Sequence, residues 1–311
     1  MHFDGTIWRP PYEAQSLLLQ VTAGCTHHAC KFCTLYEDLP FRFRMSPPEE
    51  IEDDLREAQL WSTDPIAMLS ARLTGVSRPG GVRRVFLTGA NPFVLSFRRL
   101  KAIAELIHNY FPLVESIGCF ARVTDVSLKS DEELPELHRL GYDGITIGVE
   151  TGDDAALAFM NKGYQARDII EQAARLDAAR ISYNFFYLAG ISGAGHGVEG
   201  AIKSADVFNR THPRMIGSSM LTIFPESELY REIQRGNWQE ESELEKLAEL
   251  KALIDHLTIA TRIATDGASN LVQIRGDLPA DRERLSGDLA RLLESADETV
   301  LREYRAGLRH L

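Results

Sequence analysis

Three cysteines stand close together near the start of the chain, in the stretch AGCTHHACKFCTLY at residues 23–36. Cys25, Cys30 and Cys33 have the spacing C-x4-C-x2-C, and the only other cysteine among the 311 residues is Cys119. Clustered cysteines in a reducing compartment more often bind zinc or an iron–sulfur cluster than form disulfides. Three thiols in one loop therefore predict a metal centre that lacks one protein ligand.

Three kinds of metal centre are compatible with this spacing. A plant-type two-iron ferredoxin site would need Cys119 as its fourth ligand, although that residue lies within an apolar stretch far along the chain. A zinc site could use His27 or His28, but two adjacent histidines between ligating cysteines make poor geometry for a tetrahedral site. The third is a four-iron cluster with three thiolates, which leaves one iron open to a small molecule. A histidine bound permanently to that iron would instead make the protein an electron carrier.

Composition and charge exclude several other classes of protein. The chain is 44% hydrophobic and 25% charged, which is ordinary for a globular domain. Its 45 acidic and 34 basic residues give a net charge of −11, which argues against general binding to nucleic acid or to an anionic membrane. No apolar run approaches the ~20 residues of a membrane span, and the first residues do not resemble a signal peptide. We therefore expect a cytoplasmic protein.

The elements that must position the cysteines follow a repeated order of strand, polar loop and helix. This alternation predicts parallel βαβ units, and near-continuous apolar strands predict burial on both faces of the sheet. Right-handed crossovers would curl six such units into an α/β fold, a partial (β/α)6 barrel. The cysteine loop follows the first strand, at the rim that carries the chemistry of such barrels. The expected strands are residues 16–22, 83–89, 114–122, 144–150, 181–190 and 215–224.

The chain is expected to have two parts, a barrel at 1–237 and an extension at 238–311. The extension begins with a long charged amphipathic helix that should pack on the outside of the barrel, and it ends in a further helical element. Between them, residues 269–279 are predicted to form a strand that ends in a turn. Residues 61–80 are predicted to be an inserted loop or short helix with SRPGG as its turn, and Ser46 is expected to cap the preceding helix.

Two further groups of polar residues have an open role. Arg42 and Arg44 follow the cysteine loop and either lie in solvent, face an anionic ligand or help to shape the loop. The segment 267–277 carries polar residues among apolar ones. These either point to water or close the open side of the barrel, with Asn270 or Arg275 facing a polar substrate. The polar residues of this segment are Ser269, Asn270, Gln273 and Arg275.

Taken together, the cysteine loop and six βα units resemble the radical S-adenosylmethionine (SAM) superfamily. Its usual spacing is C-x3-C-x2-C, and this chain has one extra residue in the first gap. The segment IGVETGDDAALAFMNKGY at 147–164 is similar to the fourth strand of one subgroup. That subgroup contains oxygen-independent coproporphyrinogen oxidase, methylthiotransferases and elongator-type enzymes. The chain has no second cysteine cluster, which counts against the methylthiotransferases. The resemblance covers roughly residues 15–237.

The resemblance implies a role for individual residues. Cys25, Cys30 and Cys33 would hold a 4Fe-4S cluster. Phe32, the aromatic before the third cysteine, would pack near the adenine of SAM, although it could equally cover the cluster. Asn91, in LTGANP at 87–92, would help to hold the amino group of SAM, although glycine, asparagine and proline also suit a simple turn.

The later segments imply the remaining contacts with SAM. Glu150 and Thr151 would meet the ribose and the amino acid end. Lys162 would reach the carboxylate, although a solvated lysine before Gly163 is the alternative. Gly190, in NFFYLAGISG at 184–193, would lie along the adenine.

The function implied is reductive cleavage of SAM at the cluster. This would give methionine and a 5′-deoxyadenosyl radical, which abstracts hydrogen from a small-molecule substrate, with the cofactors supplying the reactivity and the protein orienting them. A reductant such as flavodoxin or ferredoxin is the second expected partner, and no membrane or nucleic acid partner is expected. The alternative is a non-catalytic carrier or sensor that binds an iron–sulfur cluster or haem. Neither reading names the substrate, because a fold does not determine one.

Overall fold

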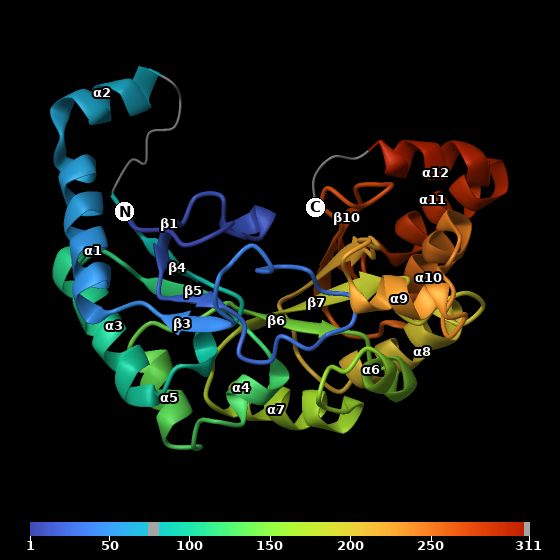
Figure 1. The fold of residues 1–311 in the computed structure, drawn as a ribbon, viewed down its shortest axis with the longest axis horizontal. Helices are drawn as coiled ribbons and strands as arrows, with labels where there is room; N and C mark the ends of the chain where they lie inside the picture. The colour runs from blue at the N-terminus through green and yellow to red at the C-terminus, as the bar shows by residue number, and fades with distance from the viewer. Residues whose placement is uncertain (74–80, 308–311) are drawn as a thin grey trace. The chain divides into compact units, whose positions relative to one another are not determined.

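The computed structural model describes residues 1–73 and 81–307 (Figure 1). Most of the predicted turn SRPGG therefore lies outside the described residues. The chain forms two compact units that exchange segments. Unit 1 consists of Met1–His28, Leu35–Thr146 and Ala178–Ile181. Unit 2 consists of Ala29–Thr34, Ile147–Asp177 and Ser182–Leu311.

Unit 1 contains three parallel strands and the helices that follow them. Strand β4 lies between β1 and β5, with Leu17 opposite Val85 and Arg84 opposite Ser116. The predicted strand at 16–22 is divided, because the chain leaves β1 after Gln20 and pairs β2 antiparallel with β3. The strands are β1 (Leu17–Gln20), β2 (Thr22–Gly24), β3 (Phe43–Met45), β4 (Arg84–Thr88) and β5 (Ser116–Ala121). The helices are η1 (Pro11–Glu13), α1 (Pro48–Thr63), α2 (Pro65–Leu73), η2 (Pro92–Val94), α3 (Phe97–Tyr110), α4 (Val123–Val126) and α5 (Glu133–Arg139).

Local sequence explains how α1 and α3 begin. Helix α3 is capped by Ser96, whose hydroxyl accepts a hydrogen bond from the Arg99 amide. Helix α1 begins without a side-chain cap at Pro47, so the prediction that Ser46 caps it is wrong. Pro48 in the first turn has no amide hydrogen to be capped and already holds a helical φ. The helix begins on the two prolines alone.

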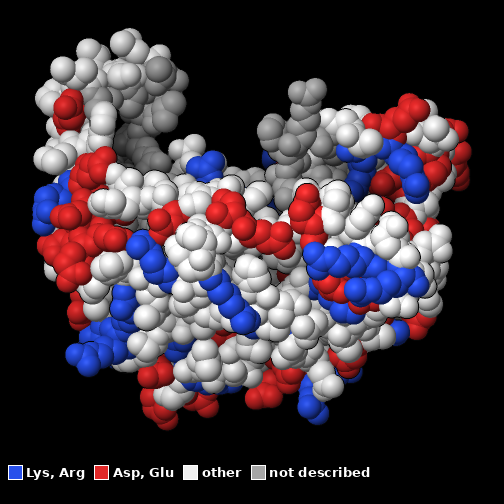
Figure 2. All heavy atoms as spheres, in the orientation of Figure 1, with Lys and Arg blue, Asp and Glu red and all other residues white. Residues whose placement is uncertain are grey.

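Acidic side chains gather on the outer surface of α1. Its first turn carries Glu49 and Glu50, and Asp53 and Glu57 are exposed further along. Figure 2 shows this red patch where α1 lies in Figure 1. The patch is consistent with the net charge of −11, and it would repel an anionic partner on this face of the unit.

Unit 2 contains the remaining parallel strands. Strand β6 (Ile145–Glu150) begins in unit 1 and ends in unit 2. Strand β8 (Met215–Met220) lies between β7 (Tyr183–Ala189) and β9 (Thr261–Ala264), and it is parallel to both. Strand β10 (Arg275–Leu278) runs antiparallel to β9. The helices that follow the strands are α6 (Asp154–Phe159), α7 (Ala166–Ala178), α8 (Gly197–Phe208) and α9 (Glu228–Gln234).

The C-terminal part of unit 2 is helical, as predicted. Helix α10 (Glu243–His256) begins at a capping box formed by Ser242 and Glu245. It packs side by side with α8 and with α11 (Arg282–Ser295), and α12 (Glu298–Ala306) follows. Over the described ranges, no helix is long and apolar enough to cross a membrane.

The six predicted strands are β1, β4, β5, β6, β7 and β8, and they belong to a mostly parallel, eight-stranded sheet. The α/β partial barrel with a helical C-terminal part is therefore confirmed. The boundary at 237/238 between barrel and extension stays a prediction, since α10 packs within unit 2 against α8 and β7.

Candidate functional site

The three clustered cysteines differ in environment from the fourth. The four cysteines form no disulfide; Cys25, Cys30 and Cys33 are half-buried, whereas Cys119 is fully buried in β5. Burial and the nearby Asp125 raise the pKa of Cys119 well above its usual value, so this thiol stays protonated in the core. Half-buried thiols can ionise and reach a metal. The donor set thus fits a three-thiolate centre and leaves Cys119 as a packing residue.

The boundary between the two units passes through the cysteine loop. Cys25 belongs to unit 1, while Cys30 and Cys33 belong to unit 2. Within the part of the chain that the structure describes, no group of three or more His, Cys, Asp or Glu residues could hold a metal ion. A four-iron cluster differs from a single ion because each thiolate binds a different iron atom, so its ligands need not meet at one point.

In unit 1, the chain around Cys25 is held by backbone contacts. The amide of Cys25 donates to the carbonyl oxygen of Arg42 at 3.0 Å, and the amide of His28 donates to the Cys25 sulfur at 3.5 Å. Gly24 has φ +78°, and a Cβ at this position would overlap the Arg42 carbonyl oxygen. The approach of the two backbones therefore requires glycine immediately before Cys25.

Arg42 shapes the cysteine loop, which is one of the roles predicted for it. Its guanidinium donates to the carbonyl oxygen of Thr26 at 3.3 Å and to that of His27. Arg44 instead pairs with Asp4 at 2.6 Å and with Glu50 at 3.0 Å. The two arginines of FRFR therefore act on different parts of the chain.

Asn91 lies just after β4 and is fully buried. Its amide group contacts Thr26 of the cysteine loop and the carboxylate of Asp125, next to β5. Our reading of the sequence missed Asp125 and the buried Lys129. Asp125 comes three residues after the predicted strand 114–122, and a polar residue just after a strand is the signal that could have found it.

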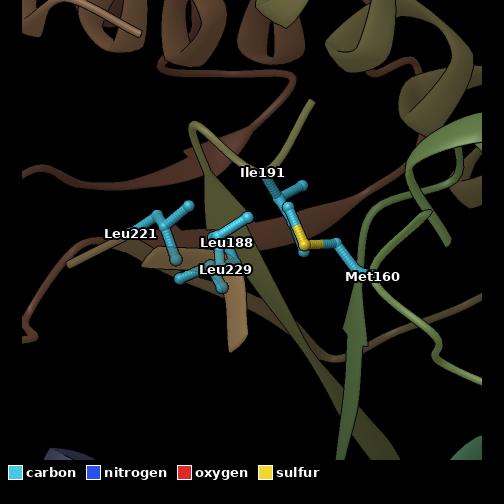
Figure 3. Packing of buried hydrophobic residues seen from close by; sticks show 5 residues of the cluster. All are labelled: Met160, Leu188, Ile191, Leu221 and Leu229. Atoms are coloured by element: carbon cyan, nitrogen blue, oxygen red, sulfur yellow. The ribbon is translucent and has the colours of Figure 1, made fainter. Parts of the chain in front are cut away.

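In unit 2, the chain around Phe32 is docked on two helices. The amide of Lys31 donates to the carbonyl oxygen of Met160 at 3.1 Å, and its carbonyl oxygen accepts from the amide of Leu229 at 2.7 Å. Phe32 packs against a buried apolar cluster made of Met160, Leu188, Ile191, Leu221 and Leu229 (Figure 3). Cys30 and Cys33 therefore flank a segment whose position is fixed by both hydrogen bonds and packing.

Glu150 and Lys162 form a buried ion pair beside Phe32. The Lys162 ammonium lies 3.0 Å from a Glu150 carboxylate oxygen and 3.1 Å from the carbonyl oxygen of Gly148. Its Nζ lies 5.7 Å from the centre of the Phe32 ring and 5.6 Å from that of Tyr164. Burial opposes the charge on Lys162, but Glu150, Tyr164 and Cys30 outweigh it and raise the pKa of the lysine. Lys162 is thus not a solvated residue.

The backbone at Glu150 is unusual. Its φ is +61°, in the left-handed region that residues with a side chain rarely adopt. This conformation costs about 1–3 kcal/mol and persists where the surroundings enforce it, typically at functional sites. The structure therefore brings three of the predicted residues together, Phe32, Glu150 and Lys162, and marks one of them by strain.

Thr151 and Gly190 contact other parts of unit 2. The Thr151 hydroxyl lies 3.0 Å from that of Ser204 on α8 and accepts from the Asp153 amide at 3.1 Å. Gly190 has φ +93° and donates its amide to Glu249 on α10 at 2.6 Å. The Thr151 hydroxyl thus links the end of β6 to α8 by a hydrogen bond, and the Gly190 amide is hydrogen-bonded to α10.

Behind Gly190 lies a buried pair of acids, Glu241 and Glu249, which the sequence did not suggest. Both are fully buried, and Glu249 also accepts a hydrogen bond from the Tyr187 hydroxyl. Burial and the neighbouring Glu249 raise the pKa of Glu241 far above its usual value, and burial also raises that of Glu249. Glu241 therefore keeps its proton at neutral pH.

This pair should make the protein less stable as the pH rises. Above pH ~4.3 the unfolded chain releases a proton that the folded chain still holds on Glu241. Between pH 7 and 9 the free energy of unfolding should therefore fall by up to about 1.4 kcal/mol per pH unit. The variant Glu241→Gln keeps the neutral shape and should show a flatter dependence in urea unfolding. Glu303→Gln, at an exposed position, is the control. Equal slopes for both variants would contradict the assignment.

The segment 267–277 does not present Arg275 to a substrate. Arg275 is exposed and pairs with Asp266 at 2.7 Å, so the idea that it faces inward is wrong. Asn270 is buried, but its amide donates to the carbonyl oxygens of Ser218, Thr265 and Gly267. The Asn270 side chain thus stabilises the backbone turn after β9 through these three hydrogen bonds.

Comparison with known proteins agrees with this geometry. A family model described as the radical SAM superfamily matches residues 19–194, which is more than half of the chain. No curated relative matches in sequence. Similar solved structures include Elp3 from the archaeon Methanocaldococcus infernus, coproporphyrinogen III oxidase (HemN) from Escherichia coli, and methylornithine synthase (PylB).

The structural matches differ in how much of each protein they cover. Elp3 is 14% identical with a TM-score of 0.51, and 79% of this chain matches 58% of Elp3. HemN is 15% identical with a TM-score of 0.52, and 78% of this chain matches 52% of HemN. PylB is 14% identical with a TM-score of 0.53, and 93% of this chain matches 85% of PylB. The chain thus spans less than two thirds of the first two, and at these identities the likeness shows the fold alone.

Proposed function

This chain belongs to the radical SAM superfamily, and from that premise we propose that it is an enzyme that cleaves SAM reductively. Cys25, Cys30 and Cys33 would hold a 4Fe-4S cluster with one iron open to SAM. When bound, the cluster supplies the electron that splits SAM into methionine and a 5′-deoxyadenosyl radical. The observation that carries the proposal is the set of three half-buried thiols, none of them in a disulfide, in one loop of a chain that matches this family.

We propose that the Glu150–Lys162 pair binds the amino acid end of SAM. The pair offers a cation and an anion within 3.0 Å of each other, which complements the carboxylate and ammonium of a free amino acid. Phe32 is in reach of the same lysine, between two of the cysteines. Glu150, Tyr164 and Cys30 raise the pKa of Lys162 although burial opposes its charge, and the same burial keeps water from the pair. Gly190 would contribute its backbone to the adenine side.

The side chains of Asn91 and Thr151 have a different place in this proposal. Both are fully buried and already hydrogen-bonded within the protein, Asn91 to Thr26 and Asp125, and Thr151 to Ser204. Contacts between these two positions and SAM would therefore use the backbone. Their side chains would support the segments that carry the other contacts.

The remaining partners are proposed by chemistry class. A small molecule with an unactivated C–H bond would be the substrate, and an external one-electron donor such as flavodoxin or ferredoxin would be the reductant. A cytoplasmic location suits four cysteines that form no disulfide. The net charge of −11 makes nucleic acid an unsuitable general partner.

The experiment that tests the proposal uses the full chain reconstituted with iron and sulfide without oxygen. Adding SAM to the reduced protein should change the EPR signal of the cluster and release 5′-deoxyadenosine, measured by mass spectrometry. The double variant His27→Ala/His28→Ala should retain the cluster and the reaction. A reconstituted four-iron protein that neither responds to SAM nor cleaves it would favour the alternative of a carrier or sensor.

A further inference from the structure

We infer that Asp125 is a positioning residue that acts through Asn91 to fix the first turn of the cysteine loop before any metal binds. The inference rests on the proposed function only in taking Cys25 as a cluster ligand. Every residue involved belongs to unit 1, so the argument concerns a single compact body.

The orientation of the Asn91 amide is set by Asp125. The Asn91 Nδ2 lies 3.2 and 3.1 Å from the two carboxylate oxygens and 2.9 Å from the Thr26 hydroxyl oxygen. An ionised carboxylate only accepts hydrogen bonds, so the nitrogen of the amide must face Asp125. The oxygen Oδ1 is then left to accept from the Thr26 amide, which lies 3.5 Å away.

Asp125 is itself prevented from turning away. Its Oδ2 accepts from the Arg122 amide at 2.8 Å, in the capping box that begins α4. The next turn is pinned by Lys129, whose ammonium donates to the carbonyl oxygens of Phe93 at 2.8 Å and of Asp125 at 3.4 Å. Burial raises the pKa of Asp125 to about 6, while the bonds from Arg122 and Asn91 oppose that rise. The carboxylate is therefore ionised at pH 8.

These contacts converge on the residue next to Cys25. Thr26 has its amide and hydroxyl beside Asn91, and its carbonyl oxygen accepts from Arg42. The amide of Cys25 is bound by the Arg42 carbonyl oxygen. The loop thus enters its first turn with the Cys25 amide and the Thr26 carbonyl oxygen bound to Arg42, just before β3, and the Thr26 amide bound to Asn91, just after β4. A ligand held in this way needs little reorganisation to bind metal.

The test measures cysteine reactivity in the metal-free full chain at pH 8. N-ethylmaleimide labels each thiol, and mass spectrometry after digestion gives a separate rate for each cysteine. Asp125→Ala should increase the labelling rate of Cys25 by about tenfold, as expected when a charge-assisted hydrogen bond is lost. The rates for Cys33 and for the buried Cys119 should stay unchanged.

Exchange of the two side chains provides the decisive comparison. Asn91→Asp alone places two buried carboxylates face to face and should expose Cys25. The double variant Asn91→Asp/Asp125→Asn restores one amide facing one carboxylate, and Thr26 can donate its hydroxyl to Asp at position 91, so the wild-type rate at Cys25 should return. Failure of this rescue would overturn the inference, as would equal acceleration of Cys25 and Cys33.

The outcome is independent of the proposed function. If Asp125→Ala unfolds the protein, Cys119 becomes reactive as well, and the comparison of Asn91→Asp with the double variant then decides alone. The labelling test uses neither metal nor SAM. It can therefore show that Asp125 holds the loop even if the protein does not cleave SAM. Conversely, if the protein cleaves SAM but the labelling rate of Cys25 is unchanged in Asp125→Ala, this inference is wrong and the proposed function stands.

Discussion

Replacing any one of Cys25, Cys30 and Cys33 by alanine should reduce the formation of 5′-deoxyadenosine below detection. A cluster with three protein ligands that loses one of them is left with two thiolates, which neither retain it firmly nor keep its open iron in place. The measurements are the iron and sulfide content of the reconstituted protein and the yield of 5′-deoxyadenosine per protein after reduction with SAM present.

The matched control for these variants is Cys119→Ala. Cys119 lies fully buried in β5, where burial keeps its thiol protonated, so its loss should leave the cluster and the reaction in place. Loss of the cluster from Cys119→Ala would instead revive a two-iron ferredoxin site. A variant of Cys33 that still cleaves SAM would remove that residue from the ligand set.

Replacing Lys162 by alanine should destabilise the protein by about 3–5 kcal/mol. The change would leave the Glu150 carboxylate buried without its counter-charge, which is the costly way to break a buried ion pair. It would also leave the Gly148 carbonyl oxygen without the lysine as donor. Urea unfolding of the metal-free protein measures the loss, and binding of SAM to the folded cluster-loaded protein should weaken by about 1.5–3 kcal/mol.

Two controls separate the contribution of the pair to stability from its contribution to SAM binding. Lys101→Ala removes an exposed partner of Glu105, at a distance of 4.0 Å, and should cost less than about 1 kcal/mol. The double variant Glu150→Gln/Lys162→Met removes both charges and should regain most of the lost stability, while SAM binding stays weak. If Lys162→Ala is as stable as the wild type, the lysine is not the counter-charge that the structure indicates. Recovery of SAM binding in the double variant would remove the pair from the SAM site.

Much of the fold could be predicted because strand and helix patterns are local. Each predicted strand from 16–22 to 215–224 contains a strand of the sheet, and the helical C-terminal part is present. Such patterns depend on the neighbouring few residues, which the sequence displays directly. The expected cap at Ser46 failed for a local reason as well, since two prolines were sufficient to begin α1.

The role of individual polar residues could be predicted only in part. Cysteine spacing identified a candidate ligand set because the three thiols belong to one loop. From the sequence, Lys162 could either bind the SAM carboxylate or lie in solvent. Only the structure shows that it is buried against Glu150. Asn91 was assigned to SAM from its segment, while its side chain is in fact surrounded by Thr26 and Asp125.

By itself, the sequence determined the alternation of strands and helices, the family resemblance and the three thiols as candidate ligands. Only the tertiary structure decided which polar groups are buried together: Asp125 with Asn91, Glu249 with Gly190 and Glu241, and Lys162 with Glu150. The physical reason is that a buried charge is tolerated only beside a specific partner. That partner can come from any segment that the fold brings near, so its identity depends on how strands and helices pack and not on local residue patterns.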